Sequence, residues 1–269
     1  MTGVSHALFA VVAVLLLPFL AHAAIQSRTV PVSYGKDPAT QEEIVGECFL
    51  AWDDAIKEPR PAVLVFPDWM GNGEFSKAKA RQLAELGYVA IAVDVYGNGK
   101  LAADSKEAAE LSGAMKANRT LLRDRAARVL AMVKRLKEVD PKRVAAIGFC
   151  FGGTAALELA RSGADVQAVV SFHGGLDTPA PADAKNIRAK LLVLHGNLDP
   201  FVPAKQVQAF FDEMNAAGVD YTFTAYANAV HSFTNPAAGM DPSRGAAYNP
   251  DAERRSWAAM RLFFNELLE

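Results

Sequence analysis

Cysteine is scarce in this sequence: the 269 residues include two, Cys48 and Cys150, which lie far apart in the chain. A disulfide-rich scaffold needs several cysteine pairs, and a structural zinc site needs Cys or His ligands at short, regular spacing. The sequence has neither pattern. We therefore expect no bound metal, no cofactor and two free thiols.

Clusters of basic residues are also missing. The chain has 28 Lys and Arg against 30 Asp and Glu, a net charge of −2, which excludes the basic surface typical of nucleic-acid binding. The segment "GNGK" (97–100) resembles the end of a phosphate-binding loop. However, Asp94 stands where that loop needs its first glycine, and Leu101 where it needs Ser or Thr. Nucleic acids and nucleotides are therefore not expected as partners.

Long apolar runs are absent except at the N-terminus. Residues 7–20 form such a run, and Ala21-His22-Ala23 follows it as a small-x-small sequence typical of a signal-peptidase site. The run is shorter than a membrane span of about 20 residues. We predict a signal peptide over residues 1–23, export to the periplasm or the medium, and no membrane span in the mature chain. The alternative is an uncleaved membrane anchor.

The remaining residues, 24–269, are expected to form a single domain, since the chain is 51% apolar and 22% charged. β-rich segments alternate with helical ones along it. We expect an antiparallel pair over 28–34 and 43–52, strands over 62–69, 88–97, 143–149, 166–174, 190–196 and 220–227, helices over 75–87, 118–139, 204–218 and 251–268, a further helix after Cys150, and a loop over 98–117. This alternation predicts an α/β fold, a mostly parallel twisted sheet with helices on both faces. Functional residues in such sheets follow the C-terminal ends of strands.

The stretch "GFCFGG" (148–153) lies where a predicted strand passes into a helix. Gly148 and Gly152 flank Cys150 two positions away on either side, which is the spacing of an elbow that holds a nucleophile above the sheet. Small residues are needed there because the backbones approach closely. The N–H of Phe151, at the positive end of the following helix, would face the same point. The pattern predicts that Cys150 is an accessible nucleophile. The alternative is a buried, inert thiol.

A thiol needs a base to attack efficiently at neutral pH. Of the three histidines outside the N-terminal segment, His173 and His195 end apolar strands and are expected to be structural. His231 follows the last predicted strand, and Asp199 follows the strand before it. The order nucleophile, acid, base is that of hydrolases with a strand–turn–helix elbow. We predict a Cys150–His231–Asp199 triad, with a turn-forming role as the alternative for Asp199.

The stretches "GFCFGG", "HGNLDPFVP" and "HSF" together resemble the dienelactone hydrolase family of α/β-hydrolases, and the resemblance covers essentially the whole mature chain. It implies the α/β-hydrolase fold and cleavage of an ester or lactone through an acyl-enzyme. The family's nucleophile, acid and base fall on Cys150, Asp199 and His231. By position in the loop "FPDWMG", the N–H of Trp69 would join that of Phe151 in the oxyanion hole.

The sequence departs from the family pattern in two ways. Asp68 stands where the family has a glutamate that pairs with the resting thiol, so its reach to the thiol is one methylene shorter. A solvated loop residue is the alternative. Asn98 and Asn235 stand where dienelactone-cleaving members have two arginines for the substrate carboxylate, with Lys100 and Arg244 as candidate replacements. Asparagine cannot reproduce a bidentate, charge-assisted contact. We therefore expect Asn98 and Asn235 in a substrate pocket that favours small neutral esters or lactones.

The long segment 231–250, rich in Gly, Pro and Asn, is expected to form one lip of that pocket, or else a disordered surface loop. Three other functions are alternatives to ester hydrolysis. A thiol redox protein is disfavoured because no second cysteine lies near Cys150 in the sequence. A catalytically silent binding module and a phosphotriester hydrolase stay open as alternatives, as does the oligomeric state.

Overall fold

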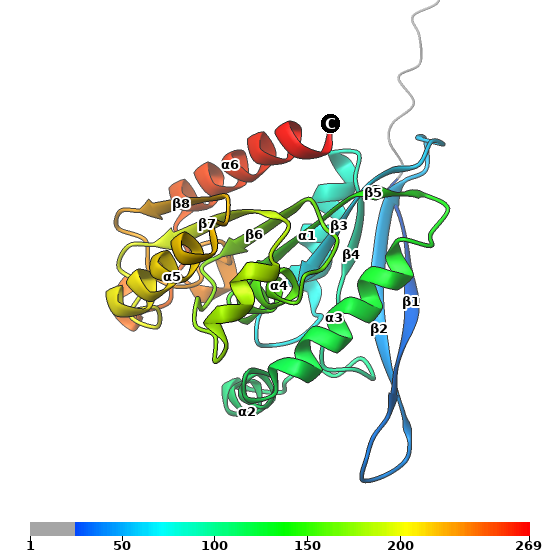
Figure 1. Ribbon diagram of the computed structural model, residues 1–269, viewed down its shortest axis with the longest axis horizontal. Coiled ribbons are helices and arrows are strands. Elements are labelled where there is room, and N and C mark those ends of the chain that lie inside the picture. Colours follow the sequence, from blue (N-terminus) through cyan, green and yellow to red (C-terminus); the bar gives the residue numbers. More distant parts are fainter. Residues whose placement is uncertain (1–24) are drawn as a thin grey trace, which may run out of the picture.

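The computed structural model describes residues 25–269, so the predicted signal peptide over residues 1–23 lies outside the described part. Its centre is one eight-stranded sheet in the order β1-β2-β4-β3-β5-β6-β7-β8 (Figure 1). The strands are β1 (Ile25–Lys36), β2 (Glu43–Asp53), β3 (Arg60–Phe66), β4 (Val89–Ala92), β5 (Val139–Phe149), β6 (Ala168–Phe172), β7 (Lys190–Gly196) and β8 (Tyr221–Tyr226). Strands β3 to β8 pair in parallel, whereas β2 is antiparallel to both β1 and β4. The mostly parallel α/β fold is confirmed.

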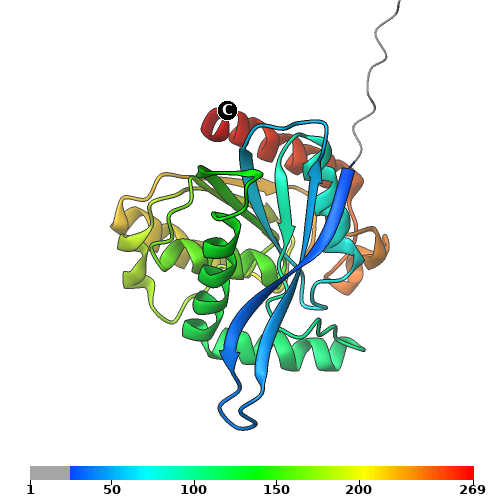
Figure 2. The ribbon, with the colours of Figure 1, turned by 90° about the vertical axis from the view of Figure 1, so that its right-hand side faces the viewer.

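Helices cover both faces of the sheet, which explains why its central strands are apolar along their whole length. On one face lie α1 (Glu74–Glu85) and α6 (Pro250–Leu268), whose Leu83 and Phe264 share a buried cluster with β-strand residues. On the other lie α3 (Arg119–Val133), α4 (Phe151–Arg161) and α5 (Ala204–Ala217), which form the second buried cluster. Figure 2 shows the β1–β2 hairpin extending beyond the rest of the sheet.

Three predicted segments differ from the structure. The expected loop over 98–117 contains a helix, α2 (Ser105–Ala117), the strand expected over 88–97 is limited to β4, and the helix expected over 118–139 ends at Val133. Asp104 caps the N-terminus of α2, and its carboxylate accepts a hydrogen bond from the N–H of Glu107 at 2.9 Å. The Glu107 carboxylate in turn accepts one from the N–H of Ala103 at 2.7 Å. This reciprocal cap starts a helix despite the weak apolar periodicity of the segment.

Strands β3, β5, β7 and β8 are parallel, so their C-terminal ends lie on the same side of the sheet. Asp68, Cys150, Asp199 and His231 each follow one of these strands, so the parallel topology gathers them at one place. Among the helices of residues 25–269, none is both long enough and apolar enough to cross a membrane.

Candidate active site

Cys150 occupies the turn between β5 and α4 with φ 56° and ψ −120°, a conformation that costs free energy for a residue with a side chain. The turn is possible because both flanking glycines lack a Cβ. A Cβ on Gly148 would lie 1.9 Å from the carbonyl oxygen of Gly152, and one on Gly152 would lie 2.2 Å from that of Phe66. The structure therefore confirms the strand–turn–helix elbow predicted from the glycine spacing.

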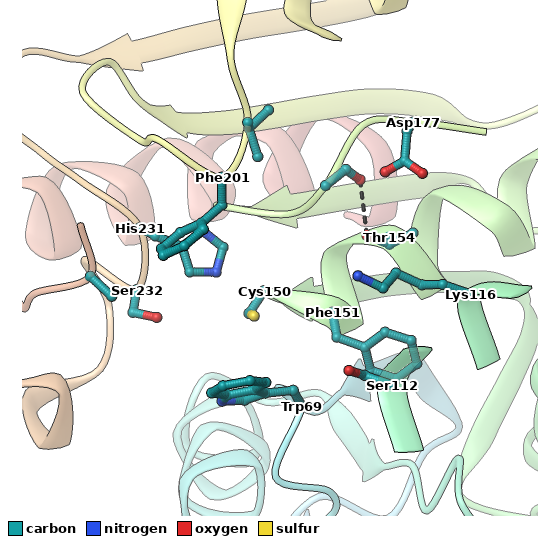
Figure 3. Close-up of a pocket in the computed structure, with 13 residues that line it drawn as sticks. Trp69, Ser112, Lys116, Cys150, Phe151, Thr154, Asp177, Phe201, His231 and Ser232 are labelled. Atoms are coloured by element: carbon teal, nitrogen blue, oxygen red, sulfur yellow. Dashed lines mark hydrogen bonds between the residues drawn. The ribbon is translucent and has the colours of Figure 1, made fainter. Parts of the chain in front are cut away.

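His231 and Asp199 form a hydrogen-bonded pair beside this elbow. Nδ1 of His231 lies 2.7 Å from Oδ2 of Asp199, whose side chain is fully buried. The other carboxylate oxygen of Asp199 accepts a hydrogen bond from the N–H of Phe201 at 2.8 Å, which fixes the orientation of the carboxylate. Because Nδ1 is engaged by Asp199, Nε2 is the free nitrogen of the imidazole. Figure 3 shows His231 and Cys150 next to each other on the wall of one cavity.

The surroundings of His231 favour its protonated form. Burial lowers the pKa of its imidazole, but the neighbouring Cys150 and the hydrogen bond to Asp199 outweigh burial and raise the pKa to about 10. A carboxylate behind the ring and a thiolate in front of it both stabilise imidazolium. A cationic imidazole is the kind of neighbour that activates a cysteine thiol for nucleophilic attack.

Trp69 and Phe151, the residues predicted to form the oxyanion hole, line the same cavity as the thiol. Phe151 is the first residue of α4 and Trp69 lies in the loop after β3, and both line the cavity with Cys150 (Figure 3). Neither N–H donates to a protein acceptor within residues 25–269. The loop is held in place by Tyr96, which stacks on Phe151 and donates its hydroxyl to the carbonyl of Trp69 at 2.9 Å. Free backbone donors on residues that line the cavity are what an oxyanion hole needs, and the oxyanion hole of Trp69 and Phe151 stays a prediction.

Asp68 lies next to Trp69, in the same loop. Burial raises the pKa of its carboxyl group, while hydrogen bonding from Met70 and the charge of His231 oppose this rise. The hydrogen bond from the N–H of Met70 to Asp68 Oδ1 measures 2.9 Å, and it closes a turn of the loop itself. The structure describes no bond between Asp68 and the thiol, so the pairing of Asp68 with Cys150 stays a prediction.

Asn98 and Asn235 do not line the cavity, contrary to the sequence-based expectation. The Asn98 carboxamide oxygen accepts a hydrogen bond from the N–H of Val45 on β2 at 2.9 Å, so this side chain supports the sheet edge. The Asn235 carboxamide caps the short turn that follows it, accepting from the N–H of Ala237. The expectation that both residues line the pocket came from their positions in the sequence relative to the family pattern. In the structure, local hydrogen bonds hold both side chains away from the cavity.

The cavity itself has a volume of about 290 Å³, which fits a small substrate. Its walls are mostly apolar, with polar groups from Ser112 and Lys116 on one side. These two residues belong to α2, and the sequence did not predict them as site residues because their segment was expected to be a loop. Lys100 and Arg244, the candidate replacements for the two family arginines, are not among the residues that line the cavity. Lys100 pairs with Glu107 at the start of α2, and Arg244 is exposed. The residues that line the cavity are Trp69, Ser112, Lys116, Cys150, Phe151, Thr154, Gly175, Asp177, Phe201, Val202, His231, Ser232 and Ala246.

Segment 231–250 contributes Ser232 and Ala246 to this lining, as expected for a lip of the pocket. Backbone hydrogen bonds hold it in shape: the N–H of His231 donates to the carbonyl of Gly245, and the N–H of Ala247 donates to that of His231.

Both cysteines are free thiols, with Cys48 buried in β2. In the described part of the chain, no group of three or more His, Cys, Asp or Glu side chains is arranged to hold a metal ion.

Comparison with known proteins identifies the family of the chain. Residues 48–268 match the model of the dienelactone hydrolase family. A putative carboxymethylenebutenolidase of Aquifex aeolicus is 30% identical over 78% of this chain and 89% of its own length. The solved structure of m3DLH is 41% identical with a TM-score of 0.84, covering 91% of this chain and all of that one. A dienelactone hydrolase-like promiscuous phosphotriesterase from metagenomic libraries is 38% identical with a TM-score of 0.83, at the same coverage. The chain that carries the Cys150 elbow and the His231–Asp199 pair therefore belongs to the dienelactone hydrolase family.

Proposed function

We propose that this protein hydrolyses carboxylic esters or lactones with Cys150 as nucleophile, His231 as general base and acid, and Asp199 as the residue that orients His231. The observation that carries the proposal is the placement of a strained, cavity-lining thiol beside an imidazole whose other nitrogen is held by a buried carboxylate at 2.7 Å. This combination supplies an activated nucleophile and a proton carrier at the same point.

In the first half-reaction, the Cys150 thiolate attacks the carbonyl carbon of the substrate. The carbonyl π bond becomes an oxyanion, which the N–H groups of Trp69 and Phe151 stabilise. When the tetrahedral intermediate collapses, the C–O bond breaks and His231 transfers the proton on Nε2 to the leaving alkoxide. The products are an alcohol and a thioester on Cys150. For a lactone, the alcohol stays attached to the acyl group.

In the second half-reaction, water attacks the thioester carbonyl and gives one proton to Nε2 of His231. Collapse of the second intermediate releases the carboxylic acid and restores the thiolate–imidazolium pair. Asp199 holds the ring in the same orientation throughout and stabilises its charged form.

Replacement of the nucleophile tests the proposal. Cys150→Ala should abolish turnover of a small aryl ester, and His231→Ala should do nearly the same because triad members act as a unit. Asp199→Asn should retain a larger residual rate. A burst of alcohol equal to the enzyme concentration, followed by slower turnover, would demonstrate the acyl-enzyme. If Cys150→Ala keeps the wild-type kcat, the mechanism is wrong, and if the wild type turns over no ester, a silent binding module is the better description.

The preferred substrates are proposed to be small and neutral. Apart from His231 of the proposed triad, Lys116 is the one cationic side chain among the residues that line the cavity, and it is exposed, so it offers a carboxylate only a weak, single-point contact. Each missing charge-assisted hydrogen bond is worth about 1.5–3 kcal/mol. A carboxylate-bearing lactone should therefore show a kcat/KM about tenfold to hundredfold lower than its methyl ester. Faster turnover of the anion would contradict this, and Lys116→Met would then identify the residue responsible.

Phosphotriesters are a second candidate substrate class, because the 38% identical solved relative is named a promiscuous phosphotriesterase. The same thiolate could attack phosphorus, with the phosphoryl oxygen in the oxyanion hole. Turnover of a neutral aryl phosphotriester by the wild type and its loss in Cys150→Ala would support this activity.

We also propose that the protein is exported. The apolar run at 7–20 and the small-x-small sequence at 21–23 support cleavage after Ala23. Expression of the full chain, followed by fractionation and intact mass measurement, tests this. A mature protein beginning at Ala24 outside the cytoplasm is the expected result, whereas an uncleaved chain in the membrane fraction would favour a retained anchor.

A further inference from the structure

His173 is a buried histidine that the catalytic steps above do not use. It follows β6 directly, is 2% exposed, and has φ 41°, a conformation that a non-glycine residue rarely adopts. Its backbone N–H donates to the carbonyl of Leu194 on β7. Its ring and that of His231 pack edge to face, with the two ring centroids 5.2 Å apart. This side chain therefore lies directly against the proposed base.

Both ring nitrogens of His173 have defined partners in the active site. Nδ1 accepts a hydrogen bond from the backbone N–H of Cys150 at 3.1 Å. Nε2 lies 2.7 Å from the hydroxyl oxygen of Thr234, a buried residue three positions after His231. A backbone N–H is always a donor, so Nδ1 carries no proton. A neutral ring then has its proton on Nε2, which donates it to Thr234.

The ring thus connects the two segments whose relative position decides whether the thiol and the imidazole meet. One hydrogen bond ends on the elbow residue itself and the other on the loop that bears His231. Burial, the charge of His231 and that of Lys79 on α1 all lower the pKa of His173, so it stays neutral. Protonation would place a second donor opposite the N–H of Cys150 and break the connection.

We propose that His173, as the neutral Nε2–H tautomer, is a positioning residue that fixes the Cys150 elbow relative to the His231 loop. The inference rests on the proposed function insofar as Cys150 is the nucleophile. The N–H of Cys150 also donates to the carbonyl of Phe172 at 3.0 Å, so removal of the His173 ring leaves this N–H with an acceptor. The expected loss is one of alignment, and misplacement of a nucleophile by about 1 Å can cost about a hundredfold in rate.

The tautomer is tested directly on the wild-type protein by ¹⁵N NMR of histidine side chains. The expected spectrum shows His173 with an unprotonated Nδ1 and a protonated Nε2, unchanged across the neutral pH range. A protonated Nδ1, or a doubly protonated ring at neutral pH, would overturn the proposal. This measurement needs no substrate, so it stands even if the wild type hydrolyses no ester.

Variants test the positioning role. His173→Leu removes both hydrogen bonds, whereas His173→Asn keeps an acceptor close to Nδ1 and tolerates positive φ. We expect His173→Leu to lower kcat per burst-titrated active site by about tenfold to a hundredfold with KM little changed, and His173→Asn to recover most of that loss. The rate of Cys150 alkylation by iodoacetamide should follow the same order.

Counting only titrated sites separates positioning from folding, because a purely structural role would reduce the burst amplitude and leave kcat per site unchanged. That result, or equal losses in the Leu and Asn variants, would overturn the proposal. If His173→Leu does not fold, Thr234→Val replaces it. This variant removes the acceptor of Nε2–H and should slow both alkylation and kcat, and wild-type rates would contradict the inference. If the wild type hydrolyses no ester but shows the expected tautomer and the expected order of alkylation rates, the proposed function is refuted and the positioning role of His173 is not.

Discussion

At the scale of single residues, the site depends on how neighbouring charges act on one imidazole. His231 is enclosed by Asp199 on one side and Cys150 on the other, and burial acts against its charged form. Since the pKa is nevertheless raised, the two partners supply more stabilisation than burial removes. The charge state of the imidazole therefore depends on the thiol, and the titration of His231 can be used to probe this dependence.

Removal of the thiol should make His231 easier to deprotonate. In Cys150→Ala, burial still lowers the pKa of His231 and Asp199 still raises it, but the contribution of the thiolate is lost. The midpoint of the His231 titration, followed by NMR, should therefore fall below that of the wild type. Cys48→Ala is the matched control, because this thiol lies in β2, and it should leave the midpoint unchanged. An equal midpoint in all three proteins would exclude a resting ion pair.

At the scale of elements, the elbow requires close contact between β5 and α4. Gly148→Ala would bring a Cβ to 1.9 Å from the Gly152 carbonyl oxygen, so a backbone shift is unavoidable. We expect a loss of about 3 kcal/mol in the free energy of unfolding. Gly113→Ala, inside α2 with nothing within 4 Å of the added Cβ, should instead gain about 0.5–1 kcal/mol. Urea unfolding measures both, and a neutral Gly148→Ala would show that the elbow is not tightly packed.

The elements also show which features the sequence could predict. Cys150, Asp199 and His231 follow strands with strong apolar patterns, and the parallel topology then brings the three together. The strand at 190–196 was predicted to the residue, because it is a continuous apolar run. Helix α2 was missed since its apolar pattern is weak, although the Asp104–Glu107 cap was a readable signal. Asn98 and Asn235 were misplaced because side-chain direction in loops depends on local hydrogen bonds, which residue spacing does not reveal.

At the scale of the whole molecule, two buried histidines should make the fold sensitive to mild acid. Burial lowers the pKa of His173 and of His195, the latter at the end of β7. In the unfolded chain both have a pKa of about 6.5. Below that pH the unfolded chain binds protons at both histidines, whereas the folded protein keeps them neutral. The free energy of unfolding therefore decreases as the pH falls. Above it both histidines are neutral in either state, and their contribution to stability is complete.

Between about pH 6.5 and pH 5, unfolding should therefore take up as many as two protons, each worth about 1.4 kcal/mol per pH unit. Asp68 and His231 act in the opposite sense, because the pKa of each is raised in the folded protein. Below about pH 6.5 the unfolded chain also protonates His231, so the opposing contribution of His231 fades over this range and leaves Asp68 as a single group against two. Urea unfolding at several pH values measures the slope. His195→Asn should remove about one proton from it, and a His173→Asn, His195→Asn double variant should flatten it. A wild-type stability that does not change over this range would mean that the two imidazoles stay solvated or accept protons without disrupting the fold.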